Sequence, residues 1–470
     1  MQSALQSPVP SAEFQTFLAE TTKLSAGNPE FPAFEAAARR FETFNATVLV
    51  SGLRSVGKSS FVCALWGDAD LLPTAERDCT QTNTLIRAPE THGGDQSIFL
   101  DYLPRDSAVN FAARGLAYHH LADMLAEYSG PLGPRLDELP PEVRLRAATS
   151  AVRKLFAENP KLAVLHENLT DDINEIEQFL NFIDSPAYRD GGRVEANWAD
   201  RREHLMGKRH PDGRTLDVGP LLALRHVELL RTSSRWAEPA PRLIDTPWIP
   251  AYHNARRMDL ILAQARQADV LLILSRPQVL EPEEWVLQIF KERPELAART
   301  VVVFNQADTV DITQLFGRDG FYAEYEITVS KLAKMKIETK NIFISCARLP
   351  FLELSLATPG ANAGALRERI VKLRAVLDRV RRQADARSGG EFKAKLLDAC
   401  NGTDCGTETV HSRIQELSFG PVYNSRISDV LNAFDKLTAA ANSPAMWKTL
   451  VDKATEFRAK LRGPAQLFSR

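Results

Sequence analysis

Short runs of aliphatic and β-branched residues recur along the chain as far as residue 344. They lie at 47–50, 97–103, 226–230, 242–244, 270–274, 301–304 and 342–344. Near-continuous apolar runs of this length are typical of strands that are buried on both faces, and helical stretches separate most of the later runs. This alternation predicts an α/β fold, with a mainly parallel sheet covered by helices.

A long segment at about 105–222 interrupts this pattern. It is rich in charge and carries turn signals at several prolines and at Gly191-Gly192. Within it, apolar residues recur at spacings of three and four, which predicts a single helical face. These residues are Leu162, Leu165, Leu169, Ile173, Ile176 and Leu180. We therefore expect a helical insertion between two strands of the sheet.

Helical periodicity also dominates both ends of the chain. Apolar positions predict helices within 11–44, and no strand-like run follows Pro359. Two stripes near the C-terminus predict helices that pack through one face. They are Leu366, Ile370, Leu373, Leu377, Val380 and Ala384, and then Ile427, Val430, Leu431, Phe434 and Leu437. The predicted domains are a helical segment at 1–44, an α/β domain at 45–350 that contains the insertion, and a helical bundle at 351–470.

Composition and charge narrow the class of protein. The 470 residues are 44% apolar and 25% charged, a balance typical of a globular protein with its own core. The 58 basic and 60 acidic residues nearly cancel, so we expect no nucleic-acid partner. The five cysteines form no C-x-x-C pair, and neither a signal peptide nor a membrane-spanning apolar run is visible. The expected location is the cytoplasm.

A phosphate-binding loop follows the first predicted strand. Residues 52–59 read G-L-R-S-V-G-K-S and match G-x-x-x-x-G-K-[ST] between a strand and a helix. In this motif, backbone N–H groups and the N-terminus of the helix surround phosphate oxygens. Lys58 would reach the β- and γ-phosphates, and Ser59 would bind Mg²⁺. The predicted nucleotide contacts here are Gly52, Leu53, Arg54, Ser55, Val56, Gly57, Lys58, Ser59 and Ser60.

The choice of base depends on a later element. Residues 301–308 form an apolar run that ends in N-Q-A-D, similar to the guanine-reading N-K-x-D element of GTPases. Asp308 can accept hydrogen bonds from the ring N–H and the exocyclic amine of guanine, whereas adenine offers no matching pair of donors. Gln306 replaces the usual lysine beside Asn305, a change that would weaken affinity without removing the Asp308 contact.

Residues 242–248 carry the second metal-binding element. They read R-L-I-D-T-P-W, which is similar to the D-x-x-G element of GTPases. Asp245 would hold Mg²⁺ through water. Trp248 replaces the glycine whose backbone N–H approaches the γ-phosphate, and a bulky residue does not readily adopt the φ > 0 conformations of glycine.

The sequence between these elements resembles bacterial dynamin-like GTPases. The resemblance is carried by G-K-S-S-F-V-C-A-L-W-G at 57–67, L-L-P-T at 71–74 and a threonine-rich stretch before the next strand. It covers about 45–104 and 223–350 but not the insertion. It implies a Mg²⁺-dependent GTPase that hydrolyses GTP to GDP and is stimulated when two GTPase domains dimerise. Thr80 is the best match to the switch threonine that binds Mg²⁺ and places the attacking water, with Thr82 second.

The resemblance also assigns roles to individual residues. Ser55 matches a P-loop serine that helps to position the attacking water, whereas Arg54 departs from the usual glutamine. Arg54 is either an internal arginine finger or a surface arginine in a dimer contact. Ser345, Cys346 and Ala347 resemble the S-A-x element that backs the guanine base. The predicted catalytic residues are Arg54, Ser55, Lys58 and Thr80.

Several partners and two other functions stay open. Self-association is implied by the resemblance, another protein partner is compatible with it, and membrane remodelling is a family property. The helix at 366–387 holds eight basic and three acidic residues, so it can dock on anionic lipid, although a solvated bundle face is the plainer interpretation.

Trp248, Gln306 and Arg54 instead favour a GTP-binding scaffold without hydrolysis. An ATP-using P-loop protein is the third hypothesis.

Overall fold

The computed structural model divides the chain into two compact units. Unit 1 comprises Met1–Ala46, Trp236–Pro241 and Ser412–Arg470, and unit 2 comprises Thr47–Arg235 and Arg242–His411. The structure describes residues 12–25, 27–42, 46–52, 55–74, 82–89, 96–128, 136–209, 216–236, 240–247, 261–276, 284–309, 320–358, 362–386, 390–402, 404–440 and 444–462.

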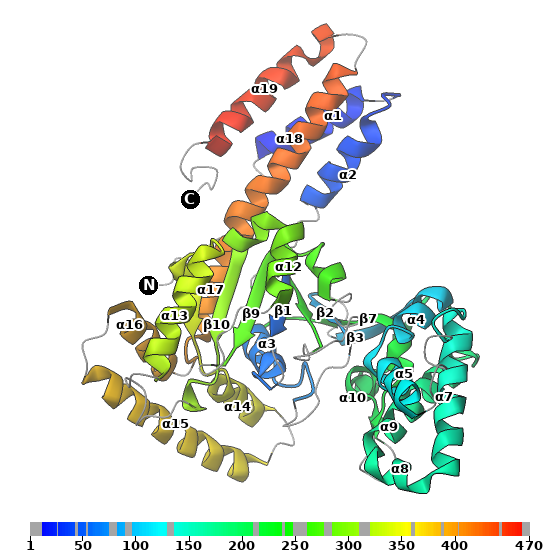
Figure 1. The fold of residues 1–470 in the computed structure, drawn as a ribbon. Coiled ribbons are helices and arrows are strands. Elements are labelled where there is room, and N and C mark those ends of the chain that lie inside the picture. The colour runs from blue at the N-terminus through cyan, green and yellow to red at the C-terminus, as the bar shows by residue number, and fades with distance from the viewer. Residues whose placement is uncertain are drawn as a thin grey trace. The chain divides into compact units, whose positions relative to one another are not determined.

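Unit 2 is built on a mixed but mainly parallel sheet (Figure 1). Over the described residues it has nine strands, in the order β11-β10-β9-β1-β8-β2-β7-β3-β4. Strands β11, β10, β9, β1 and β8 are mutually parallel, whereas β2 runs antiparallel to β8. The strands are β1 (Thr47–Gly52), β2 (Thr84–Arg87), β3 (Gln96–Tyr102), β4 (Arg193–Ala196), β7 (Leu224–Arg231), β8 (Arg242–Asp245), β9 (Val270–Ser275), β10 (Thr300–Phe304) and β11 (Ile342–Ile344).

The strands lie where the apolar runs predict them. Nearly every residue of β1, β8, β9, β10 and β11 is buried, because helices cover both faces of this part of the sheet. The predicted fold class is confirmed. Two strands of the sheet are absent from the prediction: β2 has only four residues, and β4 is a polar strand at the edge.

The helices between residues 348 and 400 belong to unit 2. Helices α14 (Arg348–Ala357), α15 (Ala363–Asp385) and α16 (Gly390–Cys400) share one hydrophobic core with β10 and β11. The first predicted stripe lies on α15, where Ile370, Leu373, Leu377, Val380 and Ala384 are buried. The sequence places a domain boundary at 350, whereas in the structure this amphipathic helix covers its apolar face with the sheet core.

The insertion is helical, as predicted, and Figure 1 shows its helices beside β3 and β7. It comprises α4 (Arg105–Ala112), α5 (Leu116–Tyr128), α7 (Pro141–Glu158), α8 (Pro160–Leu165), α9 (Glu167–Ile183) and α10 (Arg201–Met206), with β4 and the short pair β5 (Lys208–Arg209) and β6 (Leu216–Asp217). The prediction of one continuous helical face is wrong. The helix breaks at His166, so Leu169 and Ile173 are buried whereas Leu165 is 75% exposed.

Unit 1 joins the two ends of the chain in one helical bundle. It contains α1 (Ala12–Leu24), α2 (Phe31–Glu42), α18 (Tyr423–Ala439) and α19 (Pro444–Arg462). The ring of Phe14 lies 4.8 Å from that of Phe41 and 5.0 Å from that of Phe457, and Phe17 lies 5.0 Å from Phe434. Aromatic side chains from both ends of the sequence therefore form its core.

None of the helices in the described part of the chain has the length and apolar character needed to cross a bilayer.

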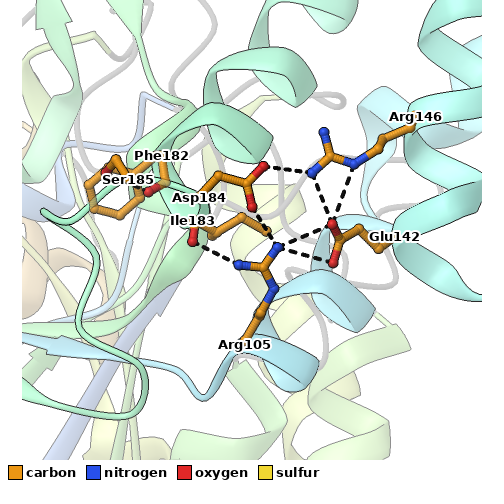
Figure 2. Close-up of polar contacts among 7 residues, drawn as sticks. All are labelled: Arg105, Glu142, Arg146, Phe182, Ile183, Asp184 and Ser185. Atoms are coloured by element: carbon orange, nitrogen blue, oxygen red, sulfur yellow. Dashed lines mark hydrogen bonds and ion pairs between the residues drawn. The ribbon is translucent and has the colours of Figure 1, made fainter.

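A charged network ties together three helices of the insertion (Figure 2). The Arg105 guanidinium donates to the Ile183 carbonyl at 2.8 Å, to Asp184 at 2.6 Å and to Glu142 at 3.1 Å. Arg146 bonds the same two carboxylates at 2.8 and 2.9 Å. These bonds lower the pKa of Glu142, chiefly through Arg146, and that of Asp184, chiefly through Arg105.

We expect Arg105→Ala to lower the free energy of unfolding by about 1–2 kcal/mol, because it removes two partly exposed ion pairs and a bond to the carbonyl end of α9. The pKa values of Glu142 and Asp184 are lower in the folded protein than in the unfolded chain. The ion pairs therefore stabilise the fold at pH values above the ordinary carboxyl pKa of about 4, and this stabilisation is lost as the pH falls through the pKa values of the folded state. Urea denaturation across pH tests this. Arg202→Ala, at an exposed arginine of α10, is the control, and an equal loss in both variants would contradict the prediction.

Candidate functional site

The predicted motifs meet at one edge of the sheet. Strands β1, β8, β10 and β11 are parallel, so their carboxyl ends lie together. Strand β1 lies between β8 and β9, and the chain continues to both sides of it. Such a switch in strand order opens a crevice in which α/β proteins bind ligands. Because β2 is antiparallel to β8, it begins at this same edge, with Thr84 opposite Asp245.

The P-loop requires glycine at both of its fixed positions. A Cβ atom on Gly52 would lie 2.1 Å from the Leu274 carbonyl oxygen of β9. Gly57 has φ +80°, and its Cβ would lie 2.8 Å from the side-chain nitrogen of Asn305. Both positions therefore require glycine because the loop packs closely against neighbouring residues, in addition to the backbone conformation that glycine allows.

Lys58 opens helix α3 (Lys58–Trp66) directly after the loop. Its ammonium is buried and donates to the Gly52 carbonyl at 3.0 Å. The side chain thus lies back over the loop, where it can meet a phosphate that the loop binds. No acidic residue occupies the first turn of α3 to offset the positive end of its dipole. Leu53 and Arg54 lie outside the described residues, and Ser55 is exposed with φ 57°.

Two buried oxygen groups form a candidate metal site. The Ser59 hydroxyl donates to Asp245 at 3.3 Å, so the predicted metal residues of the P-loop and of β8 lie side by side. A hydroxyl and a carboxylate are hard oxygen donors, which fit Mg²⁺. The adjacent Thr246 hydroxyl bonds the Val50 carbonyl at 3.0 Å and fixes the end of β8 against β1. Thr80 and Trp248 lie outside the described residues, whereas Thr82 is buried just before β2.

Asn305 connects the P-loop with the loops after β10 and β11. Its buried side-chain amide donates to the Val56 carbonyl at 2.8 Å and accepts from the Ala347 N–H at 3.0 Å. Gln306, with φ 66°, donates from its side chain to the Ser55 carbonyl at 2.8 Å. Gln306 is therefore held against the P-loop in the position where the N-K-x-D pattern has a lysine.

Asp308 is held by two side chains. The Cys346 thiol donates to one carboxylate oxygen at 3.3 Å, and Arg348 approaches the other at 3.5 Å. Burial and the neighbouring Asp308 raise the pKa of Cys346 well above its ordinary value, so the thiol keeps the proton that it donates. Both contacts orient the carboxylate without closing all of its acceptor positions.

The three residues after β11 play different parts. The Ser345 hydroxyl donates to the Cys405 carbonyl at 2.9 Å, and its own carbonyl accepts from the Ala307 N–H at 3.1 Å. Ser345 therefore fixes the loop, Cys346 contacts Asp308, and Ala347 bonds Asn305.

Sequence reasoning misses three polar residues at this edge. Arg348 contacts Asp308, and Thr84 faces Asp245 across the sheet. Asn83 is fully buried, and neither atom of its side-chain amide makes a hydrogen bond with the described part of the chain. Asn83 and Thr84 belong to the threonine-rich stretch, but only the antiparallel pairing of β2 brings them to Asp245.

Comparison with known proteins yields structural matches alone. No protein-family model matches the chain, and no curated protein matches it. Two of the matching solved chains belong to an oligomerised bacterial dynamin pair, described as providing a mechanism for the long-range sensing and tethering of membranes. One match covers 95% of this chain and 52% of that chain, with 10% identity and a TM-score of 0.39. The other covers 96% and 65%, with 10% identity and a TM-score of 0.36.

We expect Asn305→Ala to lower the free energy of unfolding by about 2–4 kcal/mol, because it leaves the Val56 carbonyl and the Ala347 N–H without their partner. Chemical denaturation measures the loss. Gln306→Ala removes a single, more exposed amide bond from the next residue and should cost less than about 1 kcal/mol. Equal effects of the two substitutions would show that the Asn305 bridge does not hold the loops together.

Proposed function

We propose that this chain is a dynamin-like GTPase that hydrolyses GTP to GDP and phosphate with Mg²⁺. The observation that carries the proposal is the Asn305 bridge. It joins Val56 of the P-loop to Ala347 beside Asp308, so a phosphate-binding sequence and a base-reading carboxylate share one sheet edge. In this proposal a single guanine nucleotide contacts both.

The phosphates bind in the P-loop. Backbone N–H groups of Gly52 through Ser60 and the N-terminus of α3 surround them, and Lys58 moves from the Gly52 carbonyl to the β- and γ-phosphates. Once the nucleotide is bound, these groups are in place before the chemical step, so they can stabilise the charge that develops on the phosphoryl oxygens without further reorganisation.

The hydrolysis step is an in-line attack by water on the γ-phosphate. Ser59, Asp245 and Thr80 would hold Mg²⁺, Asp245 through water, and Thr80 and Ser55 would orient the attacking water. When bound, the ion would supply positive charge that offsets the charge of the phosphates. Arg54 adds positive charge to the transition state, in the manner of an internal arginine finger.

Guanine is read by Asp308. Its carboxylate accepts from the ring N–H and the exocyclic amine, while Ser345, Cys346 and Ala347 lie behind the base. Adenine would leave this charged acceptor without a matching donor, which is costly at a desolvated site.

Self-association through the GTPase domain and attachment to an anionic membrane surface complete the proposal. The sequence resemblance supports both, and the bacterial dynamin pair among the structural matches is oligomerised and tethers membranes. Helix α15 presents Arg367, Arg369, Arg379 and Arg382 toward solvent, and no ion pair joins them to the described acidic side chains. Such a helix is attracted to anionic lipid. The protein would then be cytoplasmic and peripherally attached.

A GTP-binding scaffold without hydrolysis is the second candidate. Its motivation is Gln306, whose amide bonds the P-loop carbonyl of Ser55, together with Trp248 in place of the γ-phosphate glycine.

GTP turnover by the purified protein, measured over a range of protein concentrations, tests the proposal. We expect a specific rate that rises with concentration, because dimerisation stimulates hydrolysis, and no comparable turnover of ATP. Binding of GTP without turnover at any concentration would reject the GTPase in favour of the scaffold.

We expect Asp308→Asn to reduce the preference for GDP over ADP by about 10- to 100-fold, since it removes a charged acceptor worth about 1.5–3 kcal/mol. Competition binding of the two nucleotides measures this ratio. Arg348→Gln removes the ion pair but keeps the carboxylate, so it should retain the preference. An unchanged ratio in Asp308→Asn would show that Asp308 does not read the base.

A further inference from the structure

Among the described residues at the site edge, the hydroxyl of Thr84 has no hydrogen-bond partner. Thr84, the first residue of β2, is fully buried, and its Oγ1 atom makes no hydrogen bond with the described part of the chain. A buried hydroxyl without a partner lowers the stability of the folded protein. Valine would fill the same space and also favours strands, so packing alone does not account for a threonine here.

Three other buried threonines of this protein satisfy their hydroxyls. Thr300, the first residue of β10, donates to the Leu296 carbonyl at 2.7 Å. Thr246 donates to the Val50 carbonyl at 3.0 Å, and Thr149 to the Leu145 carbonyl at 3.0 Å. Thr84 differs from all three, and it is the one that lies opposite the candidate metal site.

The strand register fixes where Thr84 points. It pairs directly with Asp245 in the antiparallel ladder of β2 and β8. Directly opposite residues of such a pair have side chains on the same face, with Cβ atoms about 4.5–5.5 Å apart. The Asp245 carboxylate is in turn 3.3 Å from the Ser59 hydroxyl. Three buried oxygen groups, from β2, β8 and α3, therefore gather on one face of the sheet.

We propose that Thr84 is a positioning residue of the Mg²⁺ site, and that its hydroxyl hydrogen-bonds a water of the ion held by Ser59 and Asp245. This inference rests on the proposed function. Mg²⁺ gives up its waters reluctantly, so a site with few protein ligands needs outer partners for the waters that stay. Such partners typically change metal affinity by about 10- to 100-fold when they are removed.

If the proposal is right, Thr84→Val should maintain or raise the stability of the protein but lower its affinity for Mg²⁺. The substitution removes an unpaired buried hydroxyl, so the protein alone should be at least as stable as wild type. The same substitution should weaken the binding of Mg²⁺ by about 10-fold. A residue with a purely structural role would not separate these two properties.

The experiment measures the thermal stabilisation given by GDP over a series of Mg²⁺ concentrations. We expect the Mg²⁺ midpoint of Thr84→Val to rise by about 10-fold, and Thr84→Ser, which restores a hydroxyl, to return near wild type. Thr300→Val is the matched control. It removes a satisfied hydroxyl, so it should lower the stability of the protein while leaving the Mg²⁺ midpoint unchanged.

The outcomes separate the two proposals. A wild-type Mg²⁺ midpoint in Thr84→Val would overturn the role of Thr84 and leave the proposed function standing. If GDP fails to stabilise wild type at every Mg²⁺ concentration, the proposed function and the role of Thr84 both fall. If the valine variant does not fold, Thr84→Ala and Thr84→Ser provide the same comparison, and equal midpoints in these two variants would overturn the inference.

Discussion

The arrangement of the candidate site depends on the buried side-chain amide of Asn305. A buried amide must satisfy both its donor and its acceptor, so its position fixes the groups that it bonds. Here those groups are the Val56 carbonyl and the Ala347 N–H, which belong to segments far apart in the sequence. The same amide nitrogen fills the space that a side chain at Gly57 would need. One polar side chain thus sets the distance between the P-loop and the loop after β11.

The parallel sheet makes this bridge possible. Parallel strands end at a common edge, so residues that follow different strands meet there without any adjacency in sequence. Asp245 is the last residue of one such strand, and Asn305 and Ser345 each come directly after another. Helices α15 and α16 stabilise this edge of the sheet beside β10 and β11, because their apolar faces share a core with those strands.

Much of the fold, and the location of the site, could be predicted from the sequence. Each long apolar run is a strand, and the P-loop, Asp245 and Asp308 lie at one edge as motif order suggests. The four-residue strand β2 was not predicted, because its two aliphatic residues lie between Thr84 and Arg87 and no recognised motif marks them, as R-L-I-D-T-P-W marks β8. Its antiparallel pairing depends on tertiary contacts, and so does the position of Thr84. The break at His166 also escaped prediction, since apolar spacing continues through a bend that exposes Leu165.

Positions at which a buried polar group lacks a hydrogen-bond partner carry the most information about function. A sequence selected for stability alone would avoid a buried hydroxyl without a partner and a buried amide such as that of Asn83. Both residues stand at the start of β2, beside Asp245, whereas the hydroxyls of Thr300 and Thr246 are satisfied. At this edge of the sheet, the buried polar groups without a partner lie where a hydrated cation and phosphates could supply one. In this part of the protein, the unpaired polar groups lower the stability of the chain alone, and binding of a hydrated cation and phosphates would restore it.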